Sequence, residues 1–96
     1  MSAYQTSRNA EQELLKTLKA ANGLKVMGCQ FYRGLVGGIG VTVSNRALGI
    51  WRYDGVCFKF SPHAGEGAVT ITASVDDALE STIAIATSSF LGEYRH

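Results

Sequence analysis

The spacing of apolar residues near the N-terminus predicts a helix from about Arg8 to Ala21. The apolar residues of this helix recur at intervals of three and four residues and form one stripe: Leu14, Leu15, Leu18 and Ala21. Asn9 with Gln12 can form a capping box at the start, and Ser7 is an alternative cap. Asn22-Gly23 supplies residues that tolerate the left-handed conformation in which many helices end.

A second helix is predicted from about Val75 to Leu91. Its apolar stripe steps by four, four, three and four residues through Val75, Leu79, Ile83, Ala86 and Phe90. Ser74 followed by Asp77 matches a capping pattern at the start. Gly92 is a residue type that commonly follows a helix, so we expect the helix to end there.

The segment between the two helices is rich in residues typical of strands. We expect strands at Leu24 to Tyr32, Ile39 to Ser44 and Ala68 to Ala73, and a hairpin around Asp54-Gly55. A two-residue turn at Asp54-Gly55 pairs side chains across one buried face: Tyr53 with Val56, Trp51 with Phe58, and Gly49 with Phe60. The opposite face then carries Ile50, Arg52, Cys57 and Lys59.

A further turn at Asn45-Arg46 would determine where two valines lie. With two residues in that turn, Val41 and Val43 face Ile50 and Leu48, on the side of the sheet opposite Trp51. The sheet would then be apolar on both faces.

The predicted order is one helix, four or five antiparallel strands and a second helix. Two helices packed on one face of an antiparallel sheet are the natural α+β solution for this order. A length of 96 residues fits a single domain, 1–96, with residues 1–7 and 93–96 as frayed ends. The 46% of hydrophobic residues and the net charge of +1 exclude an intrinsically disordered chain.

The location of the protein and the state of its cysteines can be predicted from the apolar segments and metal-binding spacings that the sequence lacks. No apolar segment follows the N-terminal charges, and the longest run without a polar side chain is Gly34 to Val41, so we expect a cytoplasmic protein that does not span the membrane. The two cysteines, Cys29 and Cys57, fit free thiols, although a bridge between neighbouring strands is conceivable. No spacing typical of a metal site is present, and neither a metal nor a cofactor is expected.

Two loops carry the candidate chemistry. The segment from Gly34 to Gly40 lacks the spacing of nucleotide-binding glycine loops, and it is expected to lead into a strand instead of a helix. The segment from Ser61 to Gly67 contains His63 and Glu66, a pair that acts in acid–base chemistry only where a cleft holds both. Cys57 could pair with His63 as a nucleophile, but no helix start lies nearby to activate the thiol. No catalytic residue is assigned, and an enzyme is not expected.

The charges divide by region. Leu14 to Phe60 holds seven basic residues and one acidic residue, whereas Ser61 to His96 holds five acidic residues and one basic residue. Such segregation favours association through complementary surfaces over general binding of polyanions.

Three functional hypotheses follow. The first is a non-enzymatic interaction domain that forms a homodimer through a sheet face bearing Ile50, Arg52, Lys59, Val41 and Val43. The second is a small-molecule or minor enzymatic site between the two loops, with His63, Glu66, Gly37 and Gly38 as ligand-binding candidates. The third, less favoured because of the low net charge, is binding of single-stranded nucleic acid by a basic sheet face of Arg33, Arg46, Arg52 and Lys59.

Overall fold

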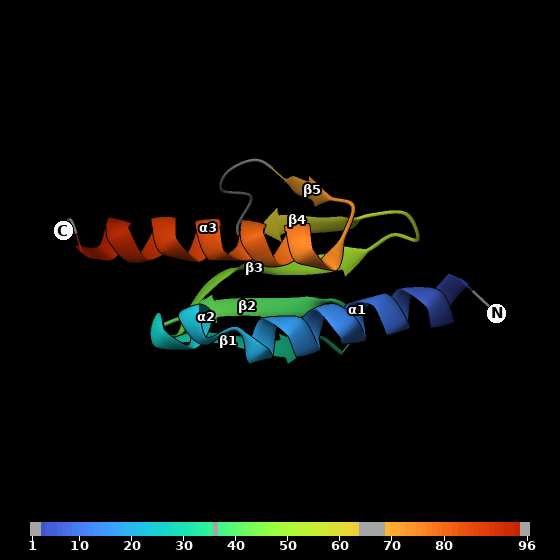
Figure 1. The fold of residues 1–96 in the computed structure, drawn as a ribbon, viewed down its shortest axis with the longest axis horizontal. Coiled ribbons are helices and arrows are strands. Elements are labelled where there is room, and N and C mark those ends of the chain that lie inside the picture. Colours follow the sequence, from blue (N-terminus) through green and yellow to red (C-terminus); the bar gives the residue numbers. More distant parts are fainter. Residues whose placement is uncertain (1–2, 36, 64–68, 95–96) are drawn as a thin grey trace.

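The computed structural model describes residues 3–35, 37–63 and 69–94, which form one antiparallel sheet and its helices (Figure 1). The elements in chain order are α1 (Ala3–Ala20), α2 (Asn22–Val26), β1 (Cys29–Arg33), β2 (Ile39–Val43), β3 (Arg46–Tyr53), β4 (Phe58–Pro62), β5 (Thr70–Thr72) and α3 (Val75–Tyr94). The five strands lie in the sheet in the order in which they occur along the chain. Each strand is antiparallel to its neighbours.

The two long helices lie on the same face of the sheet. In Figure 1 they lie side by side and run in the same direction. Helix α1 contacts β1 and β3, and α3 contacts β2 and β5. The predicted α+β architecture, a five-stranded antiparallel sheet with a helix at each end of the chain, is confirmed.

A single core fills the space between the helices and the sheet. The helices contribute their apolar stripes and the strands contribute alternate residues, as expected for a sheet covered on one side. Its buried members are Leu14, Leu15, Leu18, Leu24, Cys29, Phe31, Ile39, Val41, Val43, Trp51, Phe58, Phe60, Ala78 and Ala86.

The boundaries of the N-terminal helix differ from those expected. The helix α1 begins at Ala3, so Asn9 lies inside it and the predicted capping box with Gln12 is wrong. Residues 3–7, expected to belong to a frayed end, continue the helix because they include neither glycine nor proline and extend a segment anchored by buried leucines. The chain bends at Ala21, which is extended, and Asn22-Gly23 begins α2 instead of ending a helix. Leu24 therefore lies in a helix, and the first strand begins only at Cys29.

The start of α3 is as predicted, because the amide of Asp77 donates a 3.1 Å hydrogen bond to Ser74 Oγ. Its end is not, since the helix continues past Gly92 to Tyr94. The side that packs on the sheet also differs from the predicted stripe. Its fully buried residues are Ala78, Thr82 and Ala86, whereas Ile83 is exposed.

The hairpin between β3 and β4 has a longer loop than expected. Tyr53 pairs with Phe58 and Trp51 with Phe60, which leaves four residues, 54–57, in the loop. The predicted pairing of Tyr53 with Val56 is therefore wrong, and Val56 is exposed. The observed pairing of β3 with β4 differs from the predicted pairing by two residues. Because side chains alternate between the two faces, a shift of two residues keeps each one on its predicted face. The prediction that Trp51, Phe58 and Phe60 share a buried face is confirmed.

The predicted face of Val41 and Val43 is wrong, and a β-bulge is the reason. The turn between β2 and β3 is Ser44-Asn45, with φ of 51° and 67°. A turn at this position would by itself leave both valines on the predicted face. However, Thr42 pairs with Ala47 and Val41 pairs with Gly49, so Leu48 is an additional residue in β3 and forms the bulge. The bulge turns the remainder of β3 over, and both valines face the helices with 1% of their surface exposed. The sheet is therefore not made apolar on both faces by these valines.

The centre of the core is Trp51, which is fully buried and packs on Phe60 with ring centroids 5.2 Å apart. Gly49 makes room for this arrangement, since a Cβ there would lie 2.6 Å from the Phe60 ring. The indole Nε1 donates a 2.9 Å hydrogen bond to Thr82 Oγ1, and that hydroxyl donates a 2.7 Å bond to the Ala78 carbonyl. A buried indole N–H without an acceptor would be destabilising.

Replacing Thr82 with valine tests this contact. Thr82→Val preserves the shape of the side chain but removes the acceptor for Trp51, so we expect the free energy of unfolding to fall by about 1–3 kcal/mol. Thr87→Val is the matched control, because Thr87 is exposed on the same helix and makes only a 3.7 Å contact with Met27 Sδ. Urea denaturation of both variants measures the difference. Equal stabilities would show that the indole hydrogen bond contributes nothing.

Candidate functional site

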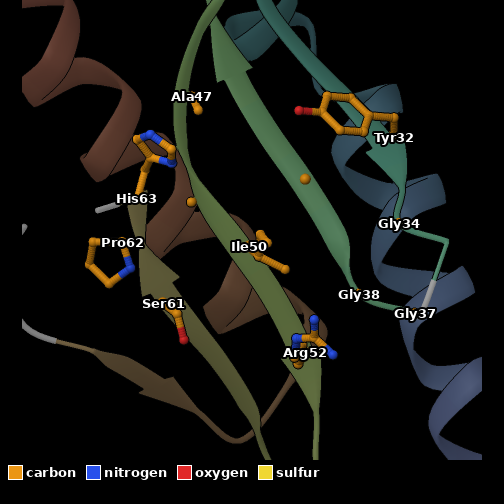
Figure 2. Close-up of a pocket in the computed structure, with 12 residues that line it drawn as sticks. Tyr32, Gly34, Gly37, Gly38, Ala47, Ile50, Arg52, Ser61, Pro62 and His63 are labelled. Atoms are coloured by element: carbon orange, nitrogen blue, oxygen red, sulfur yellow. The ribbon is translucent and has the colours of Figure 1, made fainter. Parts of the chain in front are cut away.

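The face of the sheet that the helices leave uncovered contains a groove with a volume of about 480 Å³ (Figure 2). It is lined by Tyr32, Gly34, Gly37, Gly38, Gly40, Ala47, Gly49, Ile50, Arg52, Ser61, Pro62 and His63. These residues come from the β1–β2 hairpin, from β3 and from the end of β4. Described residues of both loops expected to carry a ligand therefore line one groove, although the two loops are separated by more than 20 residues of sequence.

The apolar part of the groove is formed by a row of residues across neighbouring strands. Tyr32 pairs with Gly40, Gly40 with Ile50, and Ile50 with Ser61. The Tyr32 ring lies directly over Gly40, where a Cβ would approach its Cε2 atom to 2.5 Å. A glycine is required at this position because the ring occupies the space of a side chain. The groove thus has an aromatic ring on one side and an isoleucine at its centre (Figure 2).

Among the described lining residues, one carries a permanent charge. Arg52 lies two residues beyond Ile50 on the same face of β3, and it is exposed. Its cross-strand neighbour Lys59 forms a 3.2 Å ion pair with Asp54. Within the described part of the chain, Arg52 makes no ion pair and no acidic residue lines the groove.

Three of the four candidate ligand-binding residues lie in the groove. Gly37, Gly38 and His63 line the groove. Glu66 lies outside the described residues. The proposed interface residues divide into two groups. Ile50 and Arg52 line the groove and Lys59 lies on the same face, whereas Val41 and Val43 are buried on the opposite face.

The structure separates Cys57 from His63. They lie at opposite ends of β4, and at about 3.3 Å of rise per residue they are roughly 20 Å apart. Partial desolvation and the Asp54 carboxylate raise the pKa of the Cys57 thiol, which disfavours the reactive thiolate. Burial raises the pKa of Cys29. Both cysteines are free, as expected, and they do not lie on neighbouring strands.

The basic residues suggested for nucleic-acid binding do not share a surface. Arg33 Nη2 donates a 3.1 Å hydrogen bond to the Arg8 carbonyl in α1. Arg46 Nη2 donates a 2.7 Å bond to Ser89 Oγ in α3. Both side chains therefore extend toward the helices, and only Arg52 and Lys59 remain on the helix-free face.

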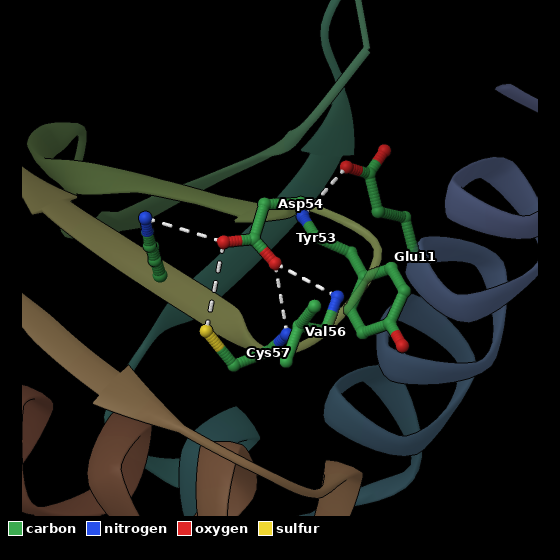
Figure 3. A network of polar contacts seen from close by, with 6 residues as sticks. Glu11, Tyr53, Asp54, Val56 and Cys57 are labelled. Atoms are coloured by element: carbon green, nitrogen blue, oxygen red, sulfur yellow. Dashed lines mark hydrogen bonds and ion pairs between the residues drawn. The ribbon is translucent and has the colours of Figure 1, made fainter. Parts of the chain in front are cut away.

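The groove is held in place from beneath by Glu11, a buried carboxylate on α1. Its Oε1 accepts a 3.0 Å hydrogen bond from the Gly38 amide. Its Oε2 accepts a bond of the same length from the Tyr53 amide (Figure 3). One side chain thus fixes the end of the glycine loop to the end of β3. Bonds from backbone amides to a carboxylate are charge-assisted, so this contact is a strong one.

Glu11 and Tyr32 were not singled out from the sequence, although each carries a signal. Glu11 occupies the same helical stripe as Leu14, Leu15 and Leu18, where an acidic residue requires a buried partner. Gly40 within a predicted strand indicates close approach of another group, and Tyr32 is that group.

The loop that joins β3 to β4 is organised by Asp54. Its Oδ1 accepts 2.9 Å hydrogen bonds from the amides of Val56 and Cys57, and its Oδ2 contacts Lys59 Nζ (Figure 3). The bonds from Cys57 and Val56, together with Lys59, hold the pKa of this carboxyl well below its usual range. The aspartate therefore closes a four-residue loop without the two-residue turn that Asp-Gly favours.

No protein-family model, curated protein or solved structure matches this chain. Within residues 3–35, 37–63 and 69–94, no helix is long and apolar enough to cross a membrane. The same residues contain no cluster of three side chains suited to a metal ion. The groove is the feature from which a function can be inferred.

Glu11→Gln tests the link between α1 and the groove. The amide nitrogen of glutamine cannot accept a hydrogen bond, so one of the two backbone amides loses its partner, at a cost of about 1–3 kcal/mol in unfolding free energy. Glu13→Gln, at an exposed position on the same helix, is the control and should change stability by less than about 0.5 kcal/mol. Thermal and urea unfolding of the two variants would contradict the assignment if both lost the same stability.

The role of Asp54 predicts a specific dependence on pH. Because its pKa is lower in the folded state than in the unfolded chain, its stabilising contribution is complete above about pH 4 and decreases as the pH falls further. Asp54→Asn keeps an oxygen for the two amides but does not titrate. Urea midpoints between pH 5 and pH 2 should therefore fall more steeply for the wild type than for this variant. Parallel curves would contradict the prediction.

Proposed function

We propose that this protein is a non-enzymatic binding domain that holds a small molecule in the groove on its helix-free face. The observation that carries the proposal is that two distant parts of the chain, residues 34, 37, 38 and 40 and residues 61–63, meet at one concave site on this face. Side chains that are not required for the core line this site, and their exposure leaves them accessible to a ligand: Tyr32, Ile50, Arg52 and Ser61.

The size and composition of the groove support this proposal. Its volume of about 480 Å³ lies within the range of about 300–1,000 Å³ that is usual for small-molecule sites. Apolar contacts come from Tyr32, Ile50 and Pro62, and a few polar groups come from Arg52, Ser61 and His63. Sites with mostly apolar walls and a few polar groups bind and orient small ligands.

Binding is better supported than catalysis. Among the described lining residues there is neither a carboxylate nor a cysteine, and His63 is the one histidine. No described residue hydrogen-bonds to the His63 ring to orient it, whereas catalytic bases are commonly held by such a partner. The described lining residues can hold a molecule, but they include no positioned pair of reacting groups.

Association of two copies through the same face is the second candidate. It is favoured by three exposed side chains on this face, since Tyr32, Ile50 and Ile71 are 52%, 41% and 62% exposed. Contact between the basic face and the acidic residues of α3 is less suitable for a closed dimer. Asp76 and Glu80 lie on the side of α3 that points away from the sheet, so such contacts would stack copies head to tail.

Filling the groove tests the proposed function. Ala47 is exposed and lines the groove, so Ala47→Trp places an indole inside it, and Ala84→Trp on the exposed side of α3 is the matched control. The probe is 8-anilinonaphthalene-1-sulfonate, followed by amide chemical shifts in ¹⁵N-labelled protein. We expect shifts at the groove residues of the wild type and of Ala84→Trp, and their loss in Ala47→Trp. Shifts that are unchanged by Ala47→Trp would contradict binding in the groove.

Sedimentation equilibrium at micromolar concentration separates the two candidates. The small-molecule proposal predicts a monomer for the wild type and for both tryptophan variants. A wild-type dimer that Ala47→Trp converts to a monomer would show that a second copy covers the groove.

A further inference from the structure

We infer that the ligand of the groove is a small aromatic acid, whose ring packs against Tyr32 and Ile50 and whose carboxylate pairs with Arg52. This inference rests on the proposed function and adds the chemical class of the ligand. It follows from the charge of the groove, from the spacing of its side chains and from the shape of its apolar part.

The charge of the groove selects an acid. Arg52 carries the one permanent charge among the described lining residues, and no carboxylate lies there to balance it. The adjacent Lys59 differs in this respect because Asp54 neutralises it at 3.2 Å. A single guanidinium balances a single negative charge, and its planar pair of N–H donors matches the two oxygens of a carboxylate.

The spacing along β3 places the acid next to an apolar surface. Ile50 and Arg52 are two residues apart on one face of the strand, which separates their Cα atoms by about 7 Å. A ring that rests on Ile50 therefore brings a carboxylate on its edge within reach of the guanidinium. Figure 2 shows Ile50 near the middle of the groove and Arg52 toward one end.

The apolar part of the groove favours a flat ring. The Tyr32 ring lies over Gly40, and Gly40 is the cross-strand neighbour of Ile50, so an aromatic ring and a branched aliphatic side chain face the same space. Aromatic rings pack well against each other in offset or edge-to-face arrangements. Ser61 continues this row on the far side of Ile50, where its hydroxyl can bind a polar substituent.

The test compares two probes of nearly equal shape, 2-naphthoate and the neutral 2-naphthamide, by isothermal titration calorimetry. The wild type should bind the naphthoate about tenfold more tightly, as expected for one charge-assisted contact. Arg52→Gln should remove this preference and leave the naphthamide unchanged. Lys59→Gln, which removes the same charge from the neighbouring position on the same face, should leave the preference intact.

Several results would overturn the inference. Equal affinity for the two probes, an unchanged preference in Arg52→Gln, or failure of the wild type to bind either probe would each do so. The first two results leave the proposed function standing if Ala47→Trp still abolishes binding of both probes. Binding of both probes that survives Ala47→Trp would overturn the groove as the binding site itself.

Discussion

Trp51 is completely buried where α3 crosses the sheet, and the surrounding structure is arranged to accommodate it. Its volume requires small residues on the facing side of the helix, which are Ala78, Thr82 and Ala86. Its N–H requires an acceptor, which Thr82 supplies at 2.9 Å. These two requirements explain why α3 turns alanines and a threonine toward the sheet and leaves Ile83 outside.

Because the helices cover only one face of the sheet, the packing on that face determines which residues are left on the opposite face. The bulge at Leu48 brings Val41, Val43 and Trp51 to the same side, so the helices cover the large β-branched and aromatic residues together. What remains on the other side includes Gly40 with the Tyr32 ring over it, Ile50 and Arg52. Glu11 connects the two sides, because a carboxylate on a core-facing helix fixes the loop that forms one wall of the groove. The groove is thus a consequence of how the core is packed.

The architecture could be predicted from periodicity, because the helical stripes and strand alternation reflect burial on a single side. The start of α3 was predictable because Ser74 acts locally, through an amide three residues away. The faces of Val41 and Val43 could not be predicted, since they depend on a bulge in the pairing of β2 with β3 that the alternating pattern does not reveal. The glycine loop and His63 were recognised as candidates from residue type alone. Their meeting in one groove, with Tyr32 and Arg52 between them, depends on strand order and register, which local pattern does not specify.

In the proposed complex, a small aromatic acid lies on the helix-free face across Tyr32, Ile50 and Arg52. Intermolecular nuclear Overhauser effects in the complex with 2-naphthoate test it most directly. We expect contacts from the naphthalene protons to the Tyr32 ring and the Ile50 methyl groups, and from the proton beside the carboxylate to the Arg52 side chain. Contacts confined to the outer side of α3, for example to Ile83, would contradict it.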